Sequence, residues 1–380
     1  MRAFPLKTLV AAAAALLASA SALADINIGV SLSLTGPGSG LGIPMQNQMK
    51  LWPQTIGGEK VNLIILDDAT DPGKGVNNAR RFVTEDKVDL IIGSCITAVA
   101  AAMTPVATEA KTVQLAASPV GVPPGQDGWL FRLPQGNDVM AHAVVEHMKK
   151  AGVKSVGFLG YTDAYGESWL NDFKAQSQQL GGPQVIAVER FARADTSVTA
   201  QALKLVAANP DAMLVVASGS GAAMPHKGIV ERGYKGKIYQ THAAASRDLV
   251  RVGGKDVEGA FVSSGPAVIP EQLPANHPSK ALAADFVAKY EKAYGPGSRN
   301  QFGGHAYDAI VVLEKTVPVA LKKAKPGTKE FRAALRDAVE NMGRTVVSHG
   351  VLNYTKDNHW GFTTETGVIL KVVNGDWKVE

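Results

Sequence analysis

Three loops, each following a β-rich run, contain residues that could contact a ligand. In residues 35–42 the glycines would let the backbone approach a small ligand closely, and an ordinary tight turn explains them equally well. No Lys-Ser or Lys-Thr pair follows this loop, and the spacing Gly-x-Gly-x-x-Gly is absent. The loop therefore argues against a nucleotide site and leaves a close contact with a small ligand as the better interpretation.

A second loop, residues 93–98, lies between an apolar run and a helix expected to begin near Thr97. Backbone N–H groups at a helix start, together with a hydroxyl, form a cradle for a carboxylate. Plain capping by Ser94 or Thr97 would look the same in the sequence, and both roles are compatible. A third loop, residues 116–123, is small and apolar with one hydroxyl, Ser118, which is typical of a pocket wall.

Cys95 and His242 raise the possibility of a cysteine-dependent hydrolase. The sequence Gly-Ser-Cys-Ile-Thr around Cys95 does not match the Gly-x-Ser/Cys-x-Gly elbow, and small buried cysteines are commoner than reactive ones. We therefore expect no enzymatic activity and no catalytic residues.

No metal site and no cofactor are predicted either. The histidines are scattered, with no pair at the i,i+4 spacing and no carboxylate at ligand spacing. Asp67, Asp68 and Asp71 are better interpreted as a turn at a strand end, with Pro72 starting the next helix, than as a calcium loop. For His242 a structural role in capping the following helix stays as open as a role in binding.

Along the chain, short β-rich runs alternate with helical patterns, and these strands and helices hold the three loops in position. We expect strands at 26–30, 61–66, 90–93, 113–115, 156–159, 185–188, 213–217, 238–240 and 260–263. Continuous apolar strands separated by helices predict parallel sheets covered on both faces. The end of the chain differs, since 368–373, Asn374-Gly375 and 377–379 predict a hairpin with a type I′ turn.

The length suits two lobes, with a break near residues 136–138 and several crossings between them. The predicted class is α/β, with two Rossmann-like lobes of parallel sheets joined by a multi-crossover hinge. The predicted division is 1–24 signal peptide, 25–138 plus 265–345 N-terminal lobe, and 139–264 plus 346–380 C-terminal lobe.

The first residues indicate export. Arg2 and Lys7 precede a short apolar run, and Ala22-Leu23-Ala24 is a small-x-small cleavage site. Asp25, not cysteine, follows the cleavage point, so we expect a periplasmic chain without a lipid anchor. Losing the leader lowers the net charge from +5 to +3, without a Lys/Arg block, which argues against nucleic acid as a partner. The one cysteine excludes an internal disulfide.

The chain resembles the periplasmic solute-binding proteins of the Leu/Ile/Val type (type I), the receptors of ABC importers. The resemblance rests on short stretches that occur in the same order along the whole mature chain: 28–37, Asp67-Asp68-Ala69-Thr70-Asp71-Pro72, 91–93, Asp163-Ala164-Tyr165-Gly166 and Ala306-Tyr307-Asp308-Ala309. It implies that Thr97 supplies a carboxylate-binding hydroxyl, that the region of Pro119 and Val120 contains the backbone donors, and that Tyr165 and Phe302 supply aromatic contacts.

The departures from this family bear on the ligand. Where relatives that bind amino acids place an acid for the ammonium group, this chain has Thr241-His242-Ala243. Gly121 and Gly219 replace a hydroxyl and a tyrosine of the family pattern, and Gly219 and Gly221 are expected to leave room. A buried ammonium without a paired acid is costly, so the sequence favours an aromatic or keto acid over an amino acid.

We therefore predict a receptor that closes its two lobes around a small carboxylate and delivers it to the permease of an ABC transporter as a monomer. A branched-chain amino-acid receptor and a ligand sensor remain alternatives. The candidate ligand-binding residues are Ser39, Leu41, Thr97, Ala98, Ser118, Pro119, Val120, Tyr165, Gly219, Ser220, His242 and Phe302.

Overall fold

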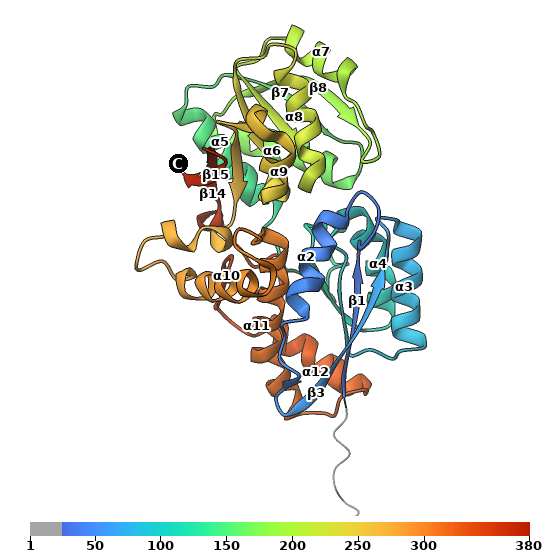
Figure 1. Ribbon diagram of the computed structural model, residues 1–380. Helices are drawn as coiled ribbons and strands as arrows, with labels where there is room; N and C mark the ends of the chain where they lie inside the picture. Colours follow the sequence, from blue (N-terminus) through green and yellow to red (C-terminus); the bar gives the residue numbers. More distant parts are fainter. Residues whose placement is uncertain (1–24) are drawn as a thin grey trace, which may run out of the picture.

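Two sheets, one in each lobe, form the framework of the computed structural model, which describes residues 25–380 (Figure 1). The predicted α/β class with two lobes is confirmed. The predicted signal peptide, residues 1–24, lies outside the described residues. Among the described helices, none combines the length and the apolar character that crossing a bilayer requires.

The first lobe is built on a sheet of order β2-β3-β1-β4-β5-β6, parallel except for the β2–β3 pair. Its strands are β1 (Ile26–Leu32), β2 (Thr55–Ile56), β3 (Glu59–Asp67), β4 (Leu90–Gly93), β5 (Val113–Ala116) and β6 (Leu130–Arg132). Its helices are α2 (Ser39–Met49), α3 (Pro72–Thr84), α4 (Thr97–Glu109), α10 (Lys280–Tyr294), α11 (Gln301–Leu321) and α12 (Lys329–Glu340).

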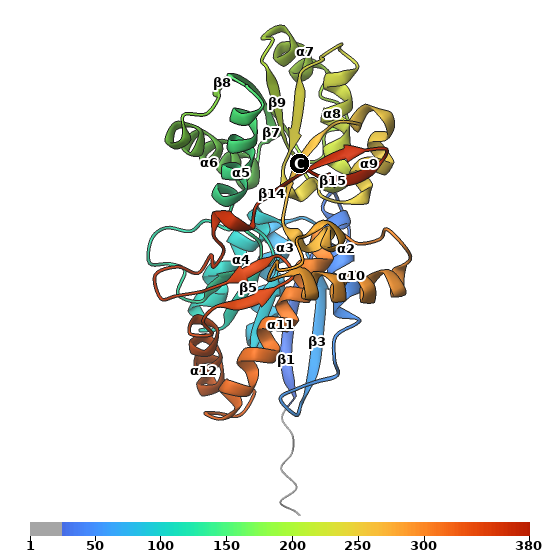
Figure 2. The same cartoon turned by 90° about the vertical axis from the view of Figure 1, so that its left-hand side faces the viewer.

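The helices of the first lobe cover both faces of this sheet. The crossover from β1 to β3 and the crossover from β3 to β4 run in opposite directions, so α2 and α3 lie on opposite faces. Helix α4 packs beside α3, while α11 packs beside α2 and α12, which Figures 1 and 2 show from two sides. Strand β4 is buried at every residue, as a strand covered on both faces must be.

The second lobe has a sheet of order β15-β14-β11-β10-β9-β7-β8, in which β14 and β15 are antiparallel to their neighbours. Its strands are β7 (Ser155–Tyr161), β8 (Gln184–Phe191), β9 (Ala212–Val216), β10 (Lys237–Gln240), β11 (Phe261–Ser264), β14 (Val368–Val373) and β15 (Asp376–Val379). Its helices are α5 (Asn137–Lys150), α6 (Ala164–Leu180), α7 (Thr199–Ala207), α8 (Ala223–Val230) and α9 (Arg247–Gly253).

Short 3₁₀ helices and a two-stranded sheet complete the chain. The 3₁₀ helices are η1 (Gly219–Ala222), η2 (His242–Ala244), η3 (Gly254–Val257), η4 (Pro266–Val268), η5 (Pro270–Gln272) and η6 (Thr364–Thr366). The small antiparallel sheet pairs β12 (Thr345–Val347) with β13 (Gly350–Leu352).

Local signals in the sequence account for several element ends. Asp71 caps α3 by accepting a hydrogen bond from the Lys74 amide, and Pro72 is the first helical residue, as predicted. The predicted hairpin is confirmed as β14 and β15. Its turn has Asn374 and Gly375 at φ 53° and 73°, the left-handed conformation that a type I′ turn requires.

The chain passes between the lobes three times: after β6, after β11 and before β14. The segment before β14, residues 345–362, is here called the strap, and it packs on the first lobe. The Tyr354 hydroxyl donates to the Arg132 carbonyl at 2.5 Å, and His359 Nδ1 donates to the Asp127 carbonyl at 2.7 Å. The last crossing therefore follows residue 362, not residue 345 as the sequence predicted.

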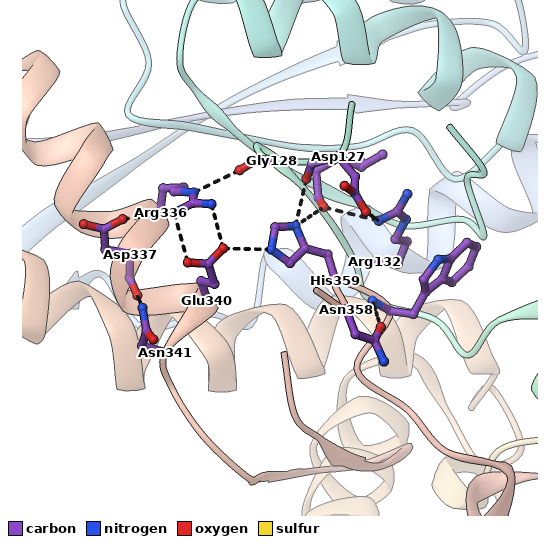
Figure 3. Close-up of polar contacts among 11 residues, drawn as sticks. Asp127, Gly128, Arg132, Arg336, Asp337, Glu340, Asn341, Asn358 and His359 are labelled. Atoms are coloured by element: carbon purple, nitrogen blue, oxygen red, sulfur yellow. Dashed lines mark hydrogen bonds and ion pairs between the residues drawn. The ribbon is translucent and has the colours of Figure 1, made fainter. Parts of the chain in front are cut away.

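Figure 3 shows the polar network that holds the strap to the first lobe. His359 Nε2 lies 3.1 Å from the Glu340 carboxylate, which also accepts hydrogen bonds from Arg336 on the same helix, α12. Arg132, fully buried, pairs with Asp127 at 3.3 Å and donates to the Val120 carbonyl at 2.9 Å. The strap, α12 and the loop that carries Val120 are thereby joined into one unit.

Candidate functional site

The site lies where the strand order of each sheet reverses. In the first sheet, the chain leads from β1 to β3 on one side and then returns to β4 on the other side of β1. The loops that follow β1 and β4 therefore run in opposite directions. In the second sheet the same reversal occurs between β7 and β9. Such switch points open a crevice beyond the carboxyl ends of the strands. In this protein the two crevices face each other between the lobes.

A small cavity of about 20 Å³ occupies this position, on a scale where one water molecule needs ~10–15 Å³. Both lobes contribute to its wall. The lining residues are Leu41, Cys95, Thr97, Ala117, Ser118, Pro119, Pro134, Tyr165, Arg193, Ser218, His242, Ala243, Phe302 and His305.

The start of α4 presents unused donors to the cavity. The residue at the N-cap position is Ile96, and no side chain caps the helix. The amides of the first turn have no partner within the helix, and Thr97, the first helical residue, borders the cavity. The capping by Ser94 or Thr97 considered from the sequence is absent, so the hydroxyl and the amides there are available to an anion.

A buried carboxylate fixes the loop before α4. Asp68 accepts hydrogen bonds from the hydroxyls of Ser31, Ser33 and Ser94, at 3.2, 2.5 and 2.7 Å. Gly93 has a φ of +120°, and a Cβ at this position would lie 2.0 Å from the Ser31 carbonyl oxygen. Only glycine fits here, so the loop can follow β1 closely and turn toward the cavity.

Arg193, in the loop after β8, is the one charged residue in the cavity wall of the described chain. Its Nε donates to Asp163 at 2.5 Å and its Nη1 to the Ser218 hydroxyl at 2.9 Å. The guanidinium also lies 4.0 Å from the Tyr161 ring centroid. Since a guanidinium carries five N–H donors, Arg193 is held rigidly and retains donors for a ligand.

Asp163 does not act as a free acid in this site. Its Oδ2 pairs with Arg193, and its Oδ1 accepts the amides of Tyr165 and Gly166 at the start of α6. The cavity wall itself contains no Asp or Glu among residues 25–380. The described site therefore offers donors to a negative group and no carboxylate to an ammonium.

Aromatic and apolar side chains form much of the remaining wall. Tyr165 is buried, and its hydroxyl donates to Thr241 Oγ1 at 2.9 Å, so the ring is fixed in place. Burial raises the pKa of Tyr165 above its ordinary value. Phe302, Pro119 and Pro134 add apolar surface, which suits a flat, apolar ligand body.

Two histidines, His242 on η2 and His305 on α11, complete the wall. Burial, together with the nearby His349, lowers the pKa of His242 to about 3. Burial, followed by His349 and His242, lowers the pKa of His305 well below 6.5. Both imidazoles are therefore neutral near pH 7.

Cys95 lines the cavity as a thiol rather than as a nucleophile. Burial and the nearby Asp68 raise its pKa to about 12. Because the thiolate is the reactive form, the environment suppresses the chemistry that a cysteine hydrolase needs.

Among residues 25–380, one group could offer ligands to a metal: His305, Asp308 and His349 place candidate atoms within 4.8 Å of one another. The sequence interpretation that no carboxylate stands at ligand spacing to a histidine is wrong here, because His305 and Asp308 are three residues apart on α11. Both Asp308 oxygens already accept hydrogen bonds, from the Ser348 amide and from His349. The rings of His305 and His349 stack at 4.2 Å with an angle of 21°, so they turn faces, not nitrogen lone pairs, toward each other.

Most of the residues selected from the sequence meet at this cavity. The predicted residues in its wall are Leu41, Thr97, Ser118, Pro119, Tyr165, His242 and Phe302. Those outside the wall are Ser39, Ala98, Val120, Gly219 and Ser220.

Three of these five residues have other surroundings in the structure. Val120 turns its carbonyl to Arg132 and buries its side chain in the first lobe. Ser220 is exposed on the outside of the site. The expected room beside Gly219 is taken by Leu41, whose Cδ1 would lie 3.2 Å from an added Cβ, and the Tyr161 hydroxyl fills the space beside Gly221.

Sequence reasoning missed Arg193, Ser218 and His305 as parts of the wall. Arg193 and Ser218 both stand just beyond the carboxyl ends of strands, β8 and β9, which is the signal that could have found them. His305 lies one turn after Phe302 on α11, so the two residues share a helix face. The prediction of Phe302 as a site residue could therefore have led to His305.

Comparisons with known proteins show the family and the fold of this chain. Residues 25–375 match the family described as "Periplasmic binding protein". An extracellular ligand-binding receptor from Rhodopseudomonas palustris is 47% identical, with a TM-score of 0.92, over 94% of this chain and 99% of that one. A Leu/Ile/Val-binding protein homolog 3 from Brucella melitensis is 24% identical over 79% of this chain and 77% of its own length.

A solute-binding protein of an ABC transporter from R. palustris, solved in complex with benzoate, shares the fold. It is 19% identical, with a TM-score of 0.77, over 94% of this chain and 95% of that one.

Proposed function

Because this chain belongs to the periplasmic binding protein family, we propose that it is the receptor of an importer and that its cargo is an aromatic carboxylate without an amino group. The observation that carries the proposal is the charge of the cavity wall. Arg193 is its one charged residue in the described chain, and no acid accompanies it. A ligand with one negative charge is stabilised there, whereas an ammonium group would be buried without a partner.

Two sets of donors support the carboxylate assignment. Arg193 supplies charge-assisted N–H donors from the second lobe, and Thr97 with the open start of α4 supplies a hydroxyl and amides from the first lobe. A carboxylate has lone pairs enough for both sets. The ligand charge would therefore connect the two lobes.

The rest of the wall supports an aromatic body. Tyr165, Phe302 and the two prolines offer flat or apolar surface to a ligand. The fold itself is compatible with this class of ligand, since the R. palustris relative of the same fold was solved with benzoate.

The capture mechanism we propose is closure of the lobes about the three crossings. A ligand held first by Thr97 would draw in Tyr165 and Arg193, and water would be expelled from the cavity. Leu41 of the first lobe already packs against Gly219 of the second, so direct contacts between the lobes accompany the ligand contacts. The closed form would then be the one that the permease of an ABC transporter recognises.

The leader at residues 1–24 supports export to the periplasm, with cleavage after Ala24. An enzymatic role is opposed by the raised pKa of Cys95 and by relatives that are binding proteins. We propose that the mature chain acts as a monomer.

A thermal-shift screen followed by isothermal titration calorimetry tests the ligand class. The panel contains benzoate, phenylglyoxylate, benzamide, leucine and phenylalanine. We expect the two aromatic carboxylates to stabilise the protein, while benzamide and both amino acids have little effect. Stabilisation by leucine or phenylalanine, without any by the aromatic carboxylates, would refute the proposal.

A further inference from the structure

His242 and His305 are polar residues of the cavity wall, and each has a ring nitrogen that is not hydrogen-bonded within the described protein. They are 3% and 1% exposed, and the Nδ1 atom of each has no hydrogen-bond partner in the described part of the chain. Buried polar atoms are almost always paired, so two unpaired ring nitrogens on one cavity point to a group that arrives with the ligand.

The two rings come from different lobes. His242 follows β10 in the second lobe and packs near Tyr165 and Trp169, with ring centroids 6.1 and 5.8 Å away. His305 lies on α11 in the first lobe and stacks on His349. A ligand group placed between them would therefore contact both lobes at a second point, apart from the carboxylate.

His349 helps to keep this part of the wall uncharged. Its Nδ1 donates to the Asp308 carboxylate at 2.7 Å, and its Nε2 is buried without a hydrogen-bond partner in the described chain. A positive charge on His242 or His305 would be buried near the other imidazoles without a carboxylate of its own. Both rings consequently present one N–H donor and one bare nitrogen acceptor.

From this arrangement we propose that His242 and His305 form a second polar subsite, which binds a hydroxyl group on the ligand. The proposal rests on the proposed function and narrows it to hydroxyl-bearing aromatic carboxylates. A hydroxyl donates one hydrogen bond and accepts others, so it can satisfy one imidazole as a donor and the other as an acceptor.

Other ligand groups fit this subsite poorly. A second carboxylate would require a cation, and the described wall has one, Arg193. An ammonium would require an acid, which the wall lacks. An unsubstituted ring or a methyl group would leave both Nδ1 atoms unpaired inside the closed cleft, which is costly.

Isothermal titration calorimetry on the mature protein tests the subsite with pairs of ligands. Each hydroxybenzoate (2-, 3- and 4-) is compared with the methylbenzoate substituted at the same position, because hydroxyl and methyl groups are similar in size. We expect at least one hydroxybenzoate to bind about tenfold or more tightly than its methyl counterpart.

Three variants then test whether His242 and His305 cause the preference for a hydroxyl group. His242→Phe and His305→Phe should each reduce the hydroxyl preference to less than about threefold while a methylbenzoate still binds. His226→Phe is the matched control, because His226 is also buried in the described chain but pairs with Gln240 and lies outside the wall. It should leave the preference unchanged.

The outcomes separate the two proposals. Equal binding within every hydroxyl and methyl pair by the wild-type protein overturns the subsite and leaves the aromatic-carboxylate function standing. A hydroxyl preference that survives both cavity variants also overturns it. Failure of every carboxylate to bind overturns the proposed function and the subsite together. If one variant does not fold, the wild-type pairs and the other variant decide.

Discussion

Replacing Arg193 with methionine removes the positive charge from the cavity wall and keeps a long, flexible side chain. The guanidinium is held by Asp163 at 2.5 Å and by Ser218 at 2.9 Å, so its remaining donors are already oriented before a ligand arrives. Hydrogen bonds to charged groups are each worth about 1.5–3 kcal/mol. The loss of one or two such bonds, about 1.5–6 kcal/mol, corresponds to a dissociation constant roughly 10- to 20,000-fold larger for an aromatic carboxylate.

The same substitution has a structural cost that must be separated from the loss of binding. It removes the contact with Tyr161 at 4.0 Å, worth about 0.5–2 kcal/mol, and it leaves Asp163 without its cation. The informative measurement is therefore the ratio of benzoate to benzamide affinity by calorimetry. The wild-type protein should strongly prefer benzoate, and Arg193→Met should lower the ratio by about tenfold or more, since Thr97 and the start of α4 remain as donors.

Arg190→Met is the matched control. Arg190 also pairs with a carboxylate, that of Glu167, at the end of β8, but it is exposed and lies outside the wall. It should keep the wild-type ratio. If Arg193→Met retains the benzoate preference while its melting curve shows a folded protein, the carboxylate is not held by Arg193 and our reasoning about charge is refuted.

Three further predictions concern stability and reactivity. Gly93→Ala should destabilise the protein by at least about 3 kcal/mol in urea unfolding, because its Cβ would lie 2.0 Å from a carbonyl oxygen. Gly58→Ala is the control, since Gly58 also has a positive φ but lies in open space, and it should destabilise the protein far less. Equal effects of the two substitutions would contradict the steric argument. Burial lowers the pKa of His226 to about 4, so the folded state favours the neutral imidazole. The contribution of this residue to the free energy of unfolding is therefore complete above pH 6.5 and is lost as the pH falls toward 4. Unfolding at pH 6.5 and near pH 5 should show a loss of about 2 kcal/mol from this residue, which His226→Leu should abolish. Cys95 should react with a thiol reagent only after denaturation, because burial raises its pKa to about 12; rapid reaction of the folded protein would contradict this.

Much of the fold could be predicted because its determinants are local. Each predicted strand overlaps an observed strand, since continuous apolar runs such as 90–93 and 213–217 bury both faces. The turn at Asn374-Gly375 and the start of α3 at Pro72 were likewise encoded by one or two residues. These features need no knowledge of the tertiary contacts.

The site was predictable where it follows from strand ends and not where it depends on distant packing. Thr97 and Tyr165 follow directly after strands, so their position near a cleft could be inferred. His305 reaches the wall because α11, which is far along the chain from the loop at residues 35–42, packs beside α2. The filling of the space at Gly219 by Leu41 is a contact between lobes, which periodicity cannot reveal.

The strap was assigned to the wrong lobe for the same reason. Ser348 and His359 of the strap are hydrogen-bonded to side chains of the first lobe, Asp308 and Glu340. Hydrogen bonds of single polar residues decide its position, and such bonds leave no periodic pattern.

The three crossings also constrain how the chain can acquire its structure during synthesis. When residue 264 leaves the ribosome, the first lobe still lacks α11, which packs beside α2, and the strap that is joined to α12. The β1–β6 sheet then has its strands but an uncovered apolar face, so neither lobe can be completed in chain order. Such long-range closure slows folding. The first lobe is therefore complete only once the strap has been synthesised, and the second only once β14 and β15 have followed.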